Sequence, residues 1–362
     1  MSPPAVGSSA PTLASRLRRQ ALWSAELLLI GVGLDLGLYP LLDGVRRTSE
    51  ELADASGIDG RYAREWLEQQ AVAGIVEVDE ETGSFGLPPG HADVLLDPGC
   101  SSYATAACVR PLQAMFRLRA ELARAYRCGT GLDSQLLGDF HGGELNTSLI
   151  RGGFLPWLLT ALAAGDRSAT DVTCVVDIGC GTGESSLAMA RGLSGASVLG
   201  VDIDGSALAR AESRRAGTAH GSRVRFVHAD ITKAELQPAD LVCILDMLHE
   251  APDPLAVLTS ARRLVRDGGA VVVLEPRAGE AFRPNGDDNE RFLYCCSLLH
   301  CLPLARASGG SVEPTGAVLR PATVRRLARA AGFTRSRTVE PPLRPDGPRQ
   351  HMNHRMYLLE EG

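Results

Sequence analysis

Lysine is almost absent from this sequence, and acidic residues outnumber basic ones. Lys233 is the only lysine among 37 basic residues, and 43 acidic residues give a formal net charge of -6. An acidic chain has no overall electrostatic attraction to nucleic acid or to anionic lipid. We therefore expect neither a nucleic-acid partner nor a membrane partner.

Long apolar runs and paired cysteine motifs are also missing. The most apolar stretch, residues 27–42, is interrupted by Asp35, whereas a membrane span needs about 20 predominantly apolar residues. We expect this stretch to be a core segment. The nine cysteines form no CxxC pair, and the N-terminus shows no secretory signal pattern. These absences predict reduced thiols and a cytoplasmic protein.

The amino-terminal third has the pattern of a winged helix. After a flexible tail, residues 1–14, the segment 15–98 contains several helical stretches and then a hairpin. Thr48 begins a capping box, which satisfies free amides at a helix start, and Gly57 ends that helix. Asp59 is placed to cap the next helix. Two short alternating runs, residues 75–78 and 84–87, predict the hairpin.

The charge of this segment argues against a winged-helix transcriptional regulator. Between Thr48 and Glu81 the sequence has ten acidic residues and two arginines, which gives a local charge of -8. DNA binding depends largely on neutralising phosphates, so such a surface would be repelled. We interpret the segment as an assembly module. The apolar stretch 27–42 is too rich for a small domain to bury alone, which predicts a homodimer.

The rest of the chain predicts an α/β fold. Residues 99–168 are mostly helical in pattern and are interpreted as a connector or lid. Residues 169–362 alternate short apolar runs with helical stretches, which is typical of a mainly parallel sheet covered by helices. Two final runs, 333–339 and 352–359, are expected to close the sheet as a hairpin.

A glycine-rich loop, residues 179–183, follows the first strand of this region. Glycines there allow a sharp turn and let a ligand approach the backbone. Asp202 ends the second strand, where a carboxylate can accept hydrogen bonds from a ribose diol. A nicotinamide dinucleotide is disfavoured because Glu184 stands where the GxGxxG pattern needs its last glycine, and an acid at a helix start repels a pyrophosphate.

Residues 177–183, Asp-Ile-Gly-Cys-Gly-Thr-Gly, resemble motif I of class I S-adenosylmethionine-dependent methyltransferases. The resemblance continues in order through the second, third and fourth strands and the Asp267-Gly268-Gly269 turn. It implies a Rossmann-like seven-stranded sheet and S-adenosylmethionine as the cofactor. In the family, the residue matching Asp202 holds the ribose and the one matching Asp230 contacts the adenine. The residue matching Leu245 lies beside the sulfonium. The implied cofactor-binding residues are Asp177, Gly179, Gly181, Gly183, Asp202, Asp230, Ile231 and Leu245.

Together with the winged-helix-like segment, this core resembles the two-domain small-molecule methyltransferases, in which the first domain mediates dimerisation. The resemblance implies a small-molecule acceptor that is methylated at a hydroxyl. His249 matches the histidine that removes the acceptor proton in related O-methyltransferases, and Glu250 replaces the aspartate that usually follows. An imidazole is chemically suited to that role near neutral pH. His249 and Glu250 are therefore the predicted catalytic residues.

Three alternatives remain open from the sequence. The first is a protein that binds the cofactor without transferring a methyl group. The second is a metal-assisted C-methyltransferase of a keto acid, because some members of this two-domain type bind metal at positions comparable to His249, Glu250 and His300. The third, a zinc site at Cys296, His300 and Cys301, lacks a fourth ligand. We expect no metal. Aromatic candidates for the acceptor pocket are Tyr103, Phe116, Phe154, Trp157, Phe292 and Tyr294.

Overall fold

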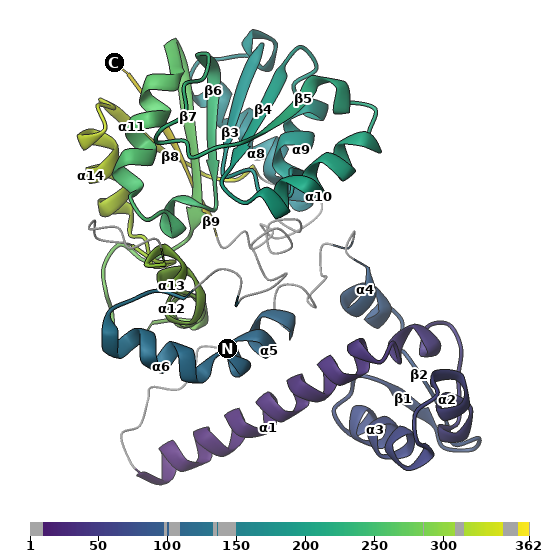
Figure 1. The fold of residues 1–362 in the computed structure, drawn as a ribbon. Helices are drawn as coiled ribbons and strands as arrows, with labels where there is room; N and C mark the ends of the chain where they lie inside the picture. Colours follow the sequence, from purple (N-terminus) through teal and green to yellow (C-terminus); the bar gives the residue numbers. More distant parts are fainter. Residues whose placement is uncertain are drawn as a thin grey trace. The chain divides into compact units, whose positions relative to one another are not determined.

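The computed structural model of the chain divides into two compact units, Met1–Arg117 and Leu118–Gly362 (Figure 1). The segment predicted as a connector, residues 99–168, is therefore shared between them. The first helix begins at Ala10, inside the segment predicted as a flexible tail. The structure describes residues 10–97, 100, 109–132, 136, 150–284, 286–307, 315–342 and 354–361.

The first unit is mainly helical with one small hairpin. Its hairpin is antiparallel, with Val78 opposite Phe85. A compact core gathers Leu52, Trp66 and Phe85 from three different elements. The elements are α1 (Ala10–Asp35), η1 (Tyr39–Leu42), α2 (Ser49–Ser56), α3 (Gly60–Val72), β1 (Glu77–Asp79), β2 (Ser84–Gly86), α4 (His91–Leu96) and α5 (Arg110–Arg117).

The helix ends of this unit follow the capping chemistry expected from the sequence. Thr48 and Glu51 form the complete capping box at the start of α2. Gly57 ends that helix with a φ of 72°, a left-handed conformation that glycine adopts without strain. Asp59 caps α3 by accepting hydrogen bonds from the backbone of Arg61 and Tyr62. These local signals fix the helix boundaries. The order of two helices followed by a hairpin matches the winged-helix-like prediction.

The apolar stretch at residues 27–42 is only partly a core segment within one chain. Leu38, Tyr39 and Leu42 are fully buried. The long helix α1, in contrast, exposes large apolar side chains over much of its length, so the sequence-based expectation of a buried segment is wrong for this part. The exposed residues of α1 are Leu13, Leu17, Leu22, Trp23, Leu28, Leu29 and Val32, and Leu36, which follows the helix, is exposed as well.

The second unit is built on a seven-stranded sheet with the order β5-β4-β3-β6-β7-β9-β8. The first five of these strands run parallel, and β9 pairs antiparallel with both β7 and β8. This confirms the predicted mostly parallel sheet with a closing hairpin. The strands are β3 (Cys174–Ile178), β4 (Ser197–Asp202), β5 (Val224–His228), β6 (Ala239–Leu245), β7 (Val265–Pro276), β8 (Arg335–Val339) and β9 (His354–Glu360).

Helices cover both faces of this sheet (Figure 1). Because alternate strand residues point to opposite faces, Val175 packs with α8 and α9 while Val176 packs with α11 and α14. No helix among the described residues is both long and apolar enough to cross a bilayer. The helical segments are α6 (Arg119–Cys128), η4 (Ile150–Phe154), α8 (Leu155–Ala164), η5 (Ala169–Asp171), α9 (Glu184–Gly192), α10 (Gly205–Ala216), η6 (Gly221–Arg223), η7 (Leu248–Glu250), α11 (Pro254–Leu264), α12 (Asp288–Cys296), η8 (Ser297–Cys301), α13 (Leu302–Ala305) and α14 (Pro321–Ala330).

Candidate active site

The glycine loop lies between the end of β3 and the start of α9. Gly179, Gly181 and Gly183 all have positive φ values, 71°, 52° and 78°. A Cβ atom on Gly179 would lie 2.6 Å from the Met247 side chain, and one on Gly183 would lie 2.6 Å from Phe226. At Gly181, however, a Cβ would meet nothing within 4 Å. Two of the glycines are therefore required by packing, whereas the third faces open space.

Asp202, at the end of β4, holds this loop in place. One carboxylate oxygen accepts a hydrogen bond from the Gly181 amide at 2.7 Å, and the other accepts one from the Asp204 amide at 2.8 Å. Burial raises the pKa of Asp202, although the amides of Asp204, Gly181 and Ile203 favour its charged form. A carboxylate offers about four lone-pair positions, more than these amides occupy, so capacity stays available to a ligand.

Asp177 is engaged with the protein itself. Its buried carboxylate accepts hydrogen bonds from the hydroxyls of Ser185 and Ser186, both at 2.6 Å. Burial raises its pKa to about 6, and the two serine hydrogen bonds act in the opposite direction. These contacts tie the end of β3 to the first turn of α9. A direct contact between Asp177 and a cofactor stays a prediction.

The residues predicted around the adenine and the sulfonium lie after the neighbouring strands. Asp230 accepts hydrogen bonds from the backbone and hydroxyl of Thr232, and it forms an ion pair of 2.9 Å with Lys233. The single lysine of the chain therefore neutralises this acid. Ile231 and Leu245 are buried. Contacts of these residues with adenine or with the sulfonium stay predictions.

His249 lies in the short turn η7 and is paired with an acid that the sequence reasoning missed. Its Nδ1 is 2.6 Å from a carboxylate oxygen of Glu275, and the other oxygen of Glu275 accepts a hydrogen bond from the Leu248 amide at 2.9 Å. Glu275 is fully buried near the end of β7. The available signal was an acid directly after the apolar run 270–274, at the carboxyl end of the strand.

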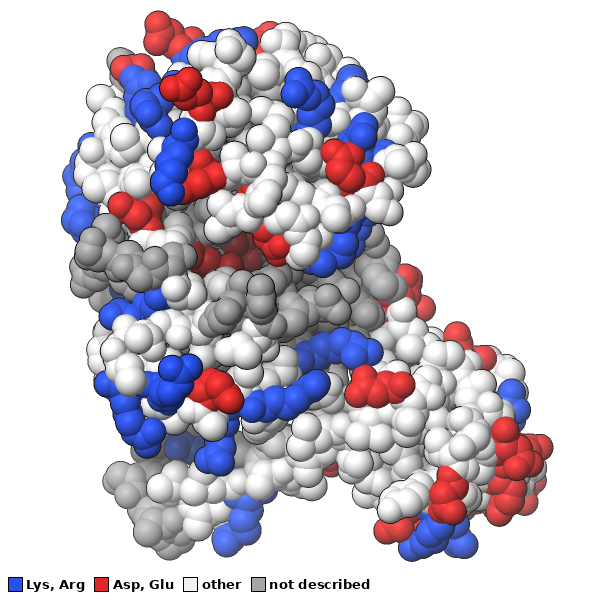
Figure 2. Space-filling view, in the orientation of Figure 1, with Lys and Arg blue, Asp and Glu red and all other residues white. Residues whose placement is uncertain are grey.

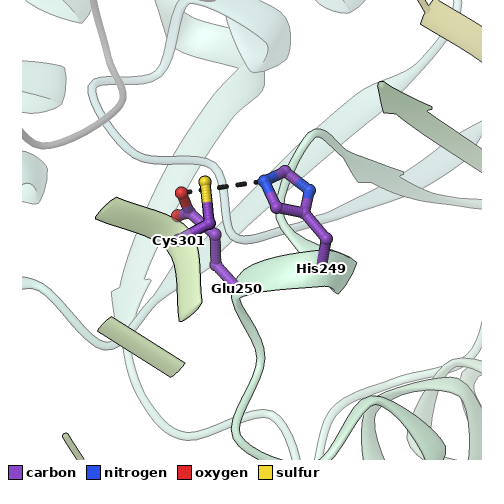
Figure 3. Close-up of side chains that lie close together, drawn as sticks. All are labelled: His249, Glu250 and Cys301. Atoms are coloured by element: carbon purple, nitrogen blue, oxygen red, sulfur yellow. Dashed lines mark ion pairs between the residues drawn. The ribbon is translucent and has the colours of Figure 1, made fainter. Parts of the chain in front are cut away.

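The second ring nitrogen of His249 lies near a polar cluster (Figure 3). Nε2 is 3.7 Å from a carboxylate oxygen of Glu250, and the same oxygen is 3.3 Å from Nδ1 of His300. The sulfur of Cys301 lies 3.7 Å from Nδ1 of His300. One ligand atom from each of His249, Glu250 and Cys301 lies within 4.8 Å of the other two. The structure thus brings the predicted pair together with His300 and Cys301.

Electrostatics in this cluster favour charged imidazoles. Burial by itself would lower the pKa of His249, but the Glu275 carboxylate and the Cys301 side chain hold it well above its usual value. Burial likewise opposes charge on His300, while Cys301 and Glu250 raise its pKa to about 10. Burial would raise the pKa of Glu250, but His300 and His249 hold that pKa below its usual value. A neutral His249 is therefore a strong proton acceptor.

The aromatic candidates for an acceptor pocket differ in burial and in their contacts. Trp157 and Phe154 are core residues on one face of the sheet, and the Trp157 indole donates a hydrogen bond of 3.0 Å to the Val339 carbonyl. Phe116 and Phe292 are exposed. The remaining two are Tyr294, which accepts a hydrogen bond from Arg320, and Tyr103, which lies outside the described residues.

Comparison with protein families identifies both units. Residues 170–313, which span the glycine loop and the His249 cluster, match the family described as "Methyltransferase domain". The chain contains a methyltransferase domain. Residues 24–96 match the "Rv2258c-like winged HTH domain". The predicted combination of a winged-helix-like unit and a methyltransferase domain is therefore confirmed.

Curated relatives match part of the chain. The ubiquinone biosynthesis O-methyltransferase of Pseudomonas fluorescens is 36% identical over 98 residues, which are 27% of this chain and 41% of the relative. That of Pseudomonas aeruginosa strain LESB58 is 40% identical over 99 residues, with the same coverage of 27% and 41%. The chain thus spans about two fifths of the length of these relatives.

Solved structures match nearly the whole chain. The mitomycin 7-O-methyltransferase MmcR covers 98% of this chain and 100% of its own, with a TM-score of 0.68 and 19% identity. Human N-acetylserotonin methyltransferase, solved with S-adenosylmethionine, covers 98% and 99%, with a TM-score of 0.67 and 16% identity. At these identities the likeness shows that the fold is shared along the chain, with the methyltransferase domain preceded by the winged-helix unit.

Proposed function

We propose that this protein transfers a methyl group from S-adenosylmethionine to a hydroxyl of a small specialised metabolite. The observation that carries the proposal is the open space beside Gly181, next to the carboxylate of Asp202, within a methyltransferase domain. Structures with this fold support it, since PigF was solved with S-adenosylhomocysteine and MmcR methylates mitomycin at an oxygen.

The cofactor would lie along the carboxyl ends of the strands. The glycine loop would approach its methionine portion, and the free lone pairs of Asp202 would accept hydrogen bonds from the ribose. Asp230 and Ile231, after β5, would meet the adenine. Leu245, at the end of β6, would lie beside the sulfonium, which places the transferred methyl near η7 and His249.

In the proposed mechanism, His249 acts as the general base. Glu275 accepts a hydrogen bond from the Nδ1–H group and orients the ring, which leaves the Nε2 lone pair for the acceptor hydroxyl. Nε2 takes the hydroxyl proton while the oxygen attacks the methyl carbon and the carbon–sulfur bond breaks. The cationic sulfonium becomes the neutral thioether of S-adenosylhomocysteine, and the positive charge ends on His249. The buried carboxylate of Glu275 stabilises this imidazolium.

Replacement of His249 by alanine tests this role. Turnover should fall about 10²–10⁴-fold while the affinity for S-adenosylmethionine stays unchanged, because only proton transfer is removed. Turnover is measured as S-adenosylhomocysteine formed with a screen of phenols, hydroxy acids and keto acids. His220→Ala is the matched control. His220 caps η6, which leads into the amino end of β5, whereas His249 follows the carboxyl end of β6. Binding of the cofactor without product for any acceptor would contradict methyl transfer.

We also infer that the first unit mediates homodimerisation and does not bind DNA. Acidic residues of α2 and α3 are exposed on this unit, in keeping with the local charge of -8 (Figure 2). Trp23 and Leu28 belong to the exposed apolar row of α1, which a second copy could cover. Light scattering at micromolar concentration should give a dimer mass, and Trp23→Glu should give a monomer. Gln20→Glu adds the same charge to an exposed polar site and should stay dimeric.

A further inference from the structure

We propose that Asp246 is a fixed negative charge that binds the sulfonium of S-adenosylmethionine and discriminates it from the neutral thioether of S-adenosylhomocysteine. The inference rests on the proposed function and adds a residue that sets the preference for the methyl donor over its product. Asp246 is the first residue after β6 (Ala239–Leu245), at the carboxyl edge of the parallel strands.

Asp246 lies between the proposed cofactor site and the proposed base. In the sheet, β6 has β3 as one neighbour and β7 as the other (Figure 1). The glycine loop follows β3, and β7 carries Glu275, which contacts His249. The next residue, Met247, has its side chain 2.6 Å from the position of a Cβ on Gly179. A methyl group that passes from the cofactor to an acceptor at His249 would therefore pass the end of β6.

The backbone of Asp246 is strained and its carboxylate is charged. Its φ is 56°, a left-handed value that is uncommon for residues other than glycine and that occurs frequently at functional sites. Oδ1 is buried and lies 3.3 Å from Nε2 of His354, but neither atom makes a hydrogen bond to the described residues. Burial alone would raise the pKa of Asp246, but His354, together with His249 and His300, holds that pKa below its usual value. A buried charge without a hydrogen bond is destabilising, and a cationic ligand would remove this penalty.

Two other acids near this edge are committed to imidazoles. One oxygen of Glu275 contacts His249, and the other accepts a hydrogen bond from a backbone amide. The carboxylate of Glu250 lies between His249 and His300, at 3.7 Å and 3.3 Å. Asp246, in contrast, has no hydrogen bond of its carboxylate within the described part of the chain. Of these three acids, Asp246 is therefore the one that suits a charge on the ligand.

The movement of charge during the reaction is compatible with this role. An interaction with the sulfonium alone would favour the bound cofactor over the transition state and slow transfer. In the proposed mechanism, however, the positive charge moves from sulfur to His249, whose charge also interacts with Asp246. The carboxylate thus keeps a cationic neighbour throughout transfer. Once His249 has released its proton, the neutral thioether offers no such interaction, and release of S-adenosylhomocysteine is favoured.

Isothermal titration calorimetry of full-length Asp246→Asn with three ligands tests the proposal. S-adenosylmethionine carries the charged sulfonium, sinefungin carries a protonated amine in its place, and S-adenosylhomocysteine is neutral there. All three share the adenosine and the α-amino acid. The variant should lose about 10-fold or more in affinity for the first two ligands and about twofold or less for S-adenosylhomocysteine, because only a nearby cation feels the lost charge. Asparagine has the same shape and tolerates the left-handed conformation, so the fold should be retained.

Asp202→Asn and Asp240→Asn are the matched controls. Asp202 faces the shared ribose in the proposed complex, so its variant should weaken all three ligands equally, whereas Asp240, at the amino end of β6, should affect none. Equal loss of all three ligands in Asp246→Asn would overturn the proposal, because it would assign the carboxylate to the shared α-ammonium. Unchanged affinities would overturn it as well. If wild type bound none of the three, the proposed function itself would fail, and the inference with it.

Discussion

Replacing Asp202 by alanine should weaken the binding of S-adenosylmethionine about 10- to 150-fold. In the proposed complex the Asp202 carboxylate receives hydrogen bonds from the ribose hydroxyls while it keeps the amides of Gly181 and Asp204. A hydrogen bond to a charged group contributes about 1.5–3 kcal/mol, and each 1.4 kcal/mol corresponds to a tenfold change in affinity. Isothermal titration calorimetry measures the affinity directly.

The matched control for this experiment is Asp240→Ala. Asp240 also holds backbone amides, those of Thr173 and Cys174 at 2.8 Å and 2.9 Å, but it lies at the start of β6 and therefore at the opposite edge of the parallel sheet. Both variants lose amide acceptors, so both should lower the free energy of unfolding by about 1–3 kcal/mol. Only Asp202→Ala should lose affinity. Unchanged affinity in Asp202→Ala, or an equal loss in Asp240→Ala, would refute the placement of the ribose.

Two further predictions follow from the loop and from the histidine pair. Gly181→Val should reduce cofactor affinity more than Asp202→Ala does, whereas Gly268→Val should leave it unchanged in calorimetry, because both sites have positive φ but only the first faces the proposed ligand space. Turnover should rise with pH through the raised pKa of His249, since only the neutral imidazole accepts a proton. Glu275→Gln removes the charge that raises this pKa, so the rising limb of its pH–rate profile should move to lower pH; an unmoved limb would contradict the pairing.

Most of the fold could be predicted from local and periodic signals in the sequence. The parallel strands are short apolar runs separated by helical stretches, so their alternation and the mainly parallel sheet could be predicted. Caps such as Thr48 and Asp59 set helix starts through contacts with residues two or three positions away. The exposure of α1 could not be read in the same way. An apolar helix face predicts burial but does not tell whether the same chain or a second copy covers it.

The site was harder to predict because its members come from distant segments. Gly179, Gly181 and Gly183 lie within five residues of sequence and could be recognised as a motif. Glu275 lies 26 residues after His249, and only the neighbouring register of β6 and β7 brings them within 2.6 Å. Asp177 shows the opposite difficulty: its position in the motif suggested a ligand contact, yet its hydrogen bonds go to serines at the start of α9.

The anchoring of the glycine loop has a consequence for how a ligand enters. Asp177 joins the strand before the loop to the helix after it, and Asp202 holds the central amide at Gly181. Fixing one residue of a flexible backbone costs roughly 1–2 kcal/mol in conformational entropy. Here folding has already met that cost for the whole loop. Binding then requires little ordering of the protein, so more of each hydrogen bond made by the ligand contributes to affinity, and the loop shape itself discriminates among ligands.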